Sequence, residues 1–198
     1  MHLIYILQPG ADMKTAIISI FKKVCLLGFI ALFLSSCAGP KVEQYANEKP
    51  NLLLSDYFNG KVKAYGIFTD RSGKVVKRFT VDLICDWKEV DGVKTGTLDE
   101  SFLYSDGTTQ KRIWTIKQTS TNQYIGTAAD VKGSAIGESA GNALNWSYTL
   151  LLPVDGKEIE VQFNDWMYLI DSKVMLNKAQ MSKFGVNLGE VTLSFFKE

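Results

Sequence analysis

Apolar and polar residues alternate with a period of two along most of the chain. In residues 79–87 one face is apolar throughout, and it comprises Phe79, Val81, Leu83, Cys85 and Trp87. Successive side chains of a strand point to opposite sides of a sheet, so this alternation predicts a half-buried strand. Similar runs predict strands at 61–69, 93–104, 110–118, 123–131, 143–152, 157–164 and 187–196.

Tight turns separate these strands at regular spacing. The dipeptide Asp-Gly, which is typical of β-hairpins, occurs between predicted strands at 91–92, 106–107 and 155–156. Many short strands joined by hairpins predict an all-β domain, and closure into an antiparallel up-and-down β-barrel would remove the exposed sheet edges. We expect one barrel domain over 52–198, with residues 173–184 open between a strand and a helical turn.

Residues 133–141 break the alternating pattern because they are nearly all Gly, Ser and Ala. They lack the Gly-Lys-Ser/Thr ending and the strand-to-helix context of a phosphate-binding loop. We predict a mobile loop here, which would serve as a lid over the barrel mouth.

The N-terminus predicts a targeting segment. Lysines precede an apolar run at 24–34, which at about 1.5 Å per residue is too short to span a bilayer but suits a signal peptide. Met13 begins a better signal than Met1, so the true start is expected there. We predict that residues 1–36 are removed.

The next residues predict a lipid anchor. Leu34-Ser35-Ser36-Cys37 resembles the bacterial lipobox, in which the cysteine receives diacylglycerol. We therefore expect Cys37 to be lipidated and 37–51 to act as a polar tether; ordinary secretory cleavage near Ala38 is the alternative. By resemblance to Gram-negative sorting rules, Ala38 favours the periplasmic face of the outer membrane.

The net charge and the lack of histidine after residue 2 exclude several classes of function. Residues 1–36 hold three of the 22 Lys and Arg residues and one of the 21 Asp and Glu residues, so the remainder carries a net charge of −1. A nearly neutral domain lacks the excess of positive charge that binding to nucleic acid requires. The only histidine is His2, so the mature chain has no Ser–His or Cys–His nucleophile and no His-ligated metal site. We expect no metal, no cofactor and no enzymatic activity.

Cys85 is the one cysteine left after Cys37. It has no partner for an intramolecular disulfide, and we predict that it is buried as a small apolar residue, a reactive thiol being the alternative.

The mature chain resembles the bacterial lipoproteins grouped as domain of unknown function 3833. The matching motifs are Tyr57-Phe58-Asn59-Gly60, 66–73, Asp99-Glu100-Ser101-Phe102, Arg112-Ile113-Trp114, Gly141-Asn142-Ala143, 165–169 and Ser182-Lys183-Phe184-Gly185. The resemblance implies a lipocalin-like (calycin-like) barrel and an envelope location, but no activity.

Polar residues in phase with apolar neighbours are the candidates for a site. A three-residue loop at 106–108 would place Glu100 near Trp114 and diagonal to Arg112. An inward Arg112 needs a partner, and Glu100 is the nearest. The pair is either a structural ion pair or a clamp for a ligand carboxylate or headgroup.

Further candidates are Asp130, Trp146, Asp165 and Trp166. Asp165 points inward if strand 157–169 is continuous; otherwise it caps a turn. The small residues before Asp130 would leave room beside Trp114 or Trp146, either as a pocket wall or as small-to-large core packing. An acid–base pair of carboxylates, as in glycosidases, is a third and weaker interpretation.

Two functions follow from this sequence. The first is a membrane-anchored lipoprotein that binds or shuttles a small apolar or lipid-like ligand in its barrel. The second is an envelope interaction protein with a filled barrel, which docks a protein partner. A cavity of about 300 Å³ or more with aromatic walls would favour the first.

Overall fold

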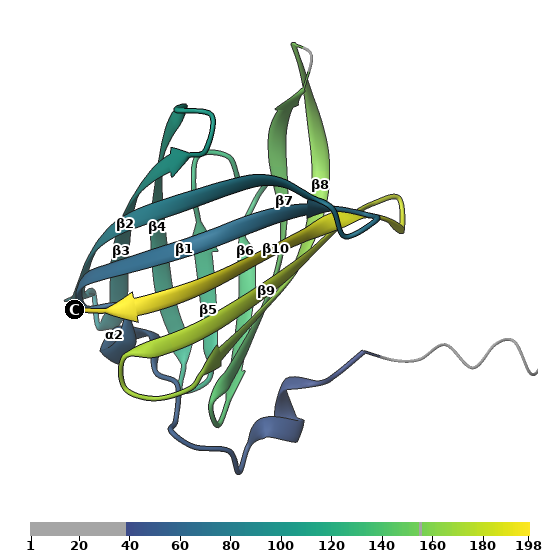
Figure 1. Ribbon diagram of the computed structural model, residues 1–198. Coiled ribbons are helices and arrows are strands. Elements are labelled where there is room, and N and C mark those ends of the chain that lie inside the picture. Colours follow the sequence, from purple (N-terminus) through teal and green to yellow (C-terminus); the bar gives the residue numbers. More distant parts are fainter. Residues whose placement is uncertain (1–38, 155) are drawn as a thin grey trace, which may run out of the picture. The chain divides into compact units, whose positions relative to one another are not determined.

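The computed structural model describes residues 39–154 and 156–198 (Figure 1). The predicted signal peptide, the start at Met13 and the lipidation site Cys37 lie outside these residues. Residues 41–198 form one compact unit with its own core. None of the helices in the described ranges is long and apolar enough to cross a bilayer.

Ten antiparallel strands, counted over the described residues, form a closed barrel, which confirms the predicted all-β up-and-down fold. Each strand pairs with its neighbours in sequence, and β1 closes the barrel against β10, with Val62 opposite Lys197. The strands are β1 Gly60–Asp70, β2 Val75–Val90, β3 Val93–Tyr104, β4 Thr109–Ser120, β5 Gln123–Thr127, β6 Ala135–Ala140, β7 Ala143–Val154, β8 Lys157–Leu169, β9 Val174–Lys183 and β10 Val186–Lys197.

The structure decides one sequence prediction, at 173–184, and overturns another, at 133–141. Residues 173–184, for which the sequence did not decide between a strand and a helical turn, contain strand β9. The predicted loop and lid at 133–141 is wrong, because this segment contains β6, which pairs with β5 and β7. Its small residues serve packing: a Cβ added to Gly137 would lie 2.7 Å from the Trp146 ring. Glycine in β6 therefore makes room for an indole on the next strand.

Alternate residues face the barrel interior, as a pleated strand requires. In β9, Asn177 and Ala179 are buried whereas the intervening Lys178 and the next residue, Gln180, are exposed. The same small-to-large packing as at Gly137 recurs in β1, where a Cβ on Gly66 would lie 2.5 Å from the Phe79 ring.

The short helix α2 (Leu54–Tyr57) closes the end of the barrel where β1 begins (Figure 1). Leu54 and the following Phe58 are buried and form part of the cavity floor. The Trp87 indole donates a hydrogen bond to the Phe58 carbonyl oxygen at 2.7 Å, and the Tyr57 hydroxyl donates to the Lys173 carbonyl oxygen at 2.9 Å. These bonds tie α2 to strand β2 and to the β8–β9 turn.

The chain before α2 lies against the outside of the barrel. The 3-10 helix η1 (Val42–Tyr45) brings the Tyr45 ring 5.8 Å from the Trp166 ring and 5.4 Å from the Tyr168 ring. A Cβ on Gly141 would lie 1.8 Å from the Tyr45 carbonyl oxygen, so this contact requires glycine. Within the segment predicted as a polar tether, Val42 is buried and Tyr45 half-buried, whereas most of the other described residues are exposed.

Candidate functional site

The barrel encloses a cavity of about 940 Å³. Most of its wall is apolar and is supplied by alternate residues of the long strands. The aromatic part of the wall includes Phe68, Phe79, Phe102, Trp114, Trp146, Tyr148 and Phe163. Six of the seven residues predicted for a ligand site line this cavity: Glu100, Arg112, Trp114, Asp130, Trp146 and Asp165.

The β3–β4 hairpin places Glu100 directly opposite Arg112. The predicted diagonal arrangement was therefore off by one position along each strand. The hairpin loop is Ser105–Gly107 rather than 106–108, because Tyr104 donates a backbone hydrogen bond to Thr108 at 2.9 Å. Gly107 has a φ of +83°, and a left-handed residue belongs at the third position of a three-residue hairpin loop.

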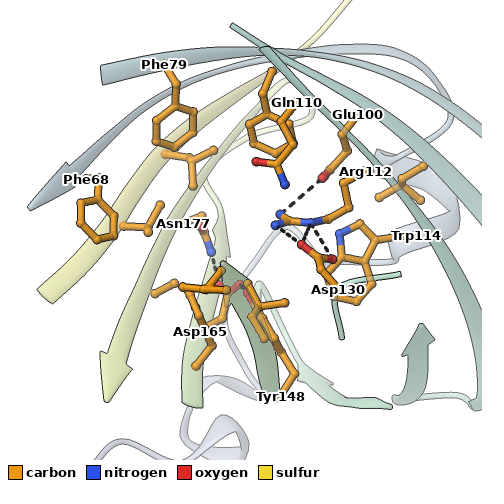
Figure 2. A pocket seen from close by; sticks show the side chains of 18 of the residues that line it. Phe68, Phe79, Glu100, Gln110, Arg112, Trp114, Asp130, Tyr148, Asp165 and Asn177 are labelled. Carbon is orange, nitrogen blue, oxygen red and sulfur yellow. Dashed lines mark hydrogen bonds and ion pairs between the residues drawn. The ribbon is translucent and has the colours of Figure 1, made fainter. Parts of the chain in front are cut away.

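Arg112 is bound mainly by Asp130, not by Glu100 as predicted (Figure 2). Its Nε lies 3.1 and 3.0 Å from the two carboxylate oxygens of Asp130, and its Nη2 lies 2.7 Å from Oδ2. Its Nη1 is 3.9 Å from Glu100 Oε2, beyond hydrogen-bonding distance. The sequence could not show this, because β5 ends at Thr127 and a turn then brings Asp130 to the cavity.

Glu100 is a carboxyl with an altered affinity for protons. Its burial raises its pKa from 4.5 to about 7, against the opposing effects of the Arg112 charge and the Trp114 indole. The charges of Asp130 and Asp165 raise the pKa further. Near neutral pH this carboxyl therefore exists in both protonation states.

A second polar group lies across the cavity around Asp165 (Figure 2). Strand β8 is continuous, so Asp165 points inward, as predicted for that case. The Tyr148 hydroxyl donates a hydrogen bond to Asp165 Oδ2 at 3.0 Å, and the Asn177 amide donates to Oδ1. Burial raises the pKa of Asp165 to about 6, although both hydrogen bonds oppose the rise.

The predicted tryptophans divide between the two faces of the barrel. Trp114 and Trp146 line the cavity while their rings lie over glycines of neighbouring strands, so both the pocket-wall and the packing interpretations hold. Trp166 follows Asp165 on the opposite face of β8 and stacks on Tyr168, with ring centroids 5.9 Å apart. It is therefore placed outside the candidate site, because adjacent strand residues face opposite ways.

Tyr148 and Asn177 were missed by the sequence reasoning. Asn177 lies in 173–184, where the sequence did not decide between a strand and a helical turn, so the direction of its side chain could not be predicted. Tyr148 is in phase with Trp146 on the strand predicted at 143–152, and this signal could have identified it.

The described carboxyls do not gather into a group that could hold a metal ion. Cys85 is buried in β2, as predicted, and burial raises the pKa of its thiol to about 12, with the nearby Glu100 charge adding to the rise. The thiolate, which is the reactive form, is therefore scarce at neutral pH.

The Glu100→Gln variant is expected to flatten the dependence of stability on pH. A carboxyl whose pKa is raised on folding stabilises the protein fully below its unfolded value and loses this contribution as the pH rises through about 7. Between about pH 5 and pH 8 the wild type should thus lose roughly 2 kcal/mol of unfolding free energy through Glu100, and the variant lacks this loss. The loss through Asp165, whose pKa is raised to about 6, remains in both proteins. Urea denaturation across this pH range measures the slope. The outward-facing Asp99→Asn is the control, and parallel profiles for Glu100→Gln and wild type would contradict the assignment.

The fold is similar to that of a solved structure. The structure of the S-type phycobiliprotein lyase CPES from Guillardia theta superposes with a TM-score of 0.55 at 5% identity, over 80% of this chain and 98% of that chain. EF1p2_mFAP2b bound to DFHBI matches with a TM-score of 0.39 at 9% identity, over 74% of this chain and 100% of that chain. No curated protein matches the chain. The model of the family described as "Protein of unknown function (DUF3833)" matches residues 31–197, and the chain therefore belongs to the DUF3833 family.

Proposed function

We propose that this protein is a membrane-anchored lipoprotein that holds or shuttles a small apolar or lipid-like ligand inside its barrel. The observation that carries the proposal is the cavity of about 940 Å³ with aromatic walls. Pockets that bind small molecules span roughly 300–1,000 Å³ and combine apolar walls with a few polar groups. A second function, an interaction protein with a filled barrel, is disfavoured by the same cavity.

The polar groups of the cavity support binding rather than catalysis. Arg112 and Asp130 neutralise each other, and Asp165 is held by the side chains of Tyr148 and Asn177. Arranged in this way, they orient a ligand headgroup among apolar walls. No histidine occurs after residue 2 to serve as a general base.

The anchor is proposed to be lipid on Cys37, on the periplasmic face of the outer membrane. Several acyl chains at about 0.8 kcal/mol per buried methylene hold a protein on a bilayer permanently. Metabolic labelling with an alkyne fatty acid should mark the full chain and should fail for Cys37→Ala. A label that persists in Cys37→Ala would place the lipid elsewhere, and an unlabelled wild type would remove the anchor from the proposal.

Ligand uptake is tested with the neutral, apolar dye N-phenylnaphthylamine and the segment 39–198, which contains the complete barrel. A cooperative thermal melt first establishes that this segment folds alone. The dye should fluoresce on binding and quench tryptophan emission, because Trp114 and Trp146 line the cavity. Saturable binding with one site per chain is expected. A folded segment that leaves dye and tryptophan emission unchanged would contradict ligand binding.

A further inference from the structure

The charged side chains that line the cavity are mostly acidic. Three carboxyls, Glu100, Asp130 and Asp165, face one guanidinium, that of Arg112. The other cation in the lining is Lys77. Its Nζ forms an ion pair with Oδ2 of Asp106, a residue of the β3–β4 turn, at 2.9 Å. Lys77 also lies over the Tyr104 ring, 4.4 Å from its centroid. The exposed Glu158 on β8 adds another negative charge to the lining.

Neighbouring carboxyls surround Arg112 and offset its charge. Asp130 takes the edge formed by its Nε and Nη2 atoms. Its guanidinium carbon lies 5.4 Å from the centroid of the Phe102 ring, and its Nη1 faces Glu100. The Nη1 atom lies beside Glu100, and the opposite edge of the guanidinium holds Asp130, so a ligand carboxylate bound at Nη1 would be repelled by two neighbouring carboxylates. The interpretation of Arg112 as a carboxylate clamp stays a prediction, and the proposal below is its alternative.

Glu100 has spare hydrogen-bond acceptor capacity. An ionised carboxyl offers about four lone-pair positions. Glu100 is 3.9 Å from Arg112, and its other neighbouring donor is the Trp114 indole. Its side chain is only 12% exposed and belongs to the cavity wall. A ligand that donates hydrogen bonds to this carboxyl would use the acceptor positions of Glu100 that the protein leaves without a donor.

We propose that the cavity selects an amphiphile with a cationic, hydrogen-bond-donating headgroup, such as a primary amine, over one with an anionic headgroup. This inference rests on the proposed ligand binding and names the chemistry of the ligand. The ammonium group binds at Glu100, between the Arg112–Asp130 pair and Asp165, and its alkyl chain lies along the apolar wall. The interaction is attractive because three carboxyls outnumber one guanidinium in a site shielded from water.

The preference for an amine depends on pH. Glu100 and Asp165, with pKa values raised to about 7 and about 6 by burial, lose their protons as the pH rises from about 5 to 8. An alkylamine keeps its charge over this range, so its affinity rises with pH. The titratable or charged groups around Glu100 are Cys85 on β2, Tyr104 on β3, Arg112 on β4, Asp130 after β5, Tyr148 on β7 and Asp165 on β8.

The test uses displacement of N-phenylnaphthylamine from the folded segment 39–198 by dodecylamine, dodecanol and dodecanoate, which share one alkyl chain. At about pH 8 dodecylamine should bind about ten-fold tighter than dodecanol, and dodecanoate more weakly than dodecanol. The ratio of the dodecanol Kd to the dodecylamine Kd should fall several-fold at about pH 5 and in Glu100→Gln. The outward-facing carboxyl variant Asp99→Asn should keep the wild-type ratio.

The outcomes separate this inference from the proposed function. If none of the three amphiphiles displaces the dye, or the dye itself does not bind, ligand binding fails. If dodecanol and dodecanoate bind and dodecylamine binds no tighter, the barrel binds ligands but the charge preference is overturned. An amine preference that Glu100→Gln leaves unchanged would also overturn it.

Discussion

Replacing Ala179 by tryptophan is expected to lower the affinity for N-phenylnaphthylamine by about ten-fold or more. Ala179 lies on β9 directly opposite Asp165, and its side chain faces the cavity. An indole at this position would occupy space that a ligand needs. Ala179 is 3% exposed and packs in a cluster with Phe163 and Met181, so the indole must also move neighbouring side chains. The free energy of unfolding should therefore fall by the roughly 1–3 kcal/mol that overpacking costs.

The matched control for Ala179→Trp is Gln180→Trp. Gln180 is the next residue of β9 and is exposed, so it faces outward. This variant should bind the dye like the wild type, with a dissociation constant within about two-fold. Unchanged dye binding in Ala179→Trp would contradict the cavity as the binding site. A loss of stability well above about 3 kcal/mol in Ala179→Trp would indicate that the barrel has no room for the indole.

Replacing Arg112 by alanine is expected to destabilise the protein by about 2–3 kcal/mol near pH 8. Removing one partner of a buried ion pair costs about 3–5 kcal/mol, because the other charge is left unpaired. The side chains of Arg112 and Asp130 are 17% and 24% exposed, so the expected loss lies at or just below the lower end of this range. Urea denaturation monitored by tryptophan fluorescence measures the loss.

A double-mutant cycle with Asp130→Asn separates the ion pair from lost packing. Arg112→Ala combined with Asp130→Asn should cost less than the sum of the two single variants, since each single variant leaves one charge of the pair without its partner and the double variant removes both charges. Lys111→Ala on the outer face of β4 breaks an exposed pair with Asp99 and should cost below about 1 kcal/mol. Additive losses in the cycle, or a loss for Arg112→Ala as small as that for Lys111→Ala, would contradict the buried ion pair.

The alternation of apolar residues predicted the barrel because it is a local property of each strand. Asp165 is an example. Because β8 is continuous, the period of two is sufficient to predict that the Asp165 carboxyl faces inward. The same rule placed Glu100 and Arg112 on the inner face. The small residues of β6 misled the prediction, since a strand that packs glycine under an indole has the composition of a loop.

The partners of the inward polar residues were harder to predict. The pairing of Glu100 with Arg112 depends on which residue of the β3–β4 turn adopts a positive φ, and a shift of one position changes every pair. Asp130 reaches Arg112 because β5 stops early and Val131 forms an isolated bridge with Leu150. Such a contact between distant segments has no signature in the local sequence.

A ligand inside the barrel is the central requirement of the proposed function. Native mass spectrometry of the segment 39–198, secreted into the periplasm of a Gram-negative host and purified without detergent, tests this claim. We predict a fraction of the protein with an added mass in the range of a fatty amine or a lipid, which organic extraction removes and which is missing from Ala179→Trp. A protein of bare mass that also takes up neither dodecylamine nor dodecanol would contradict the account.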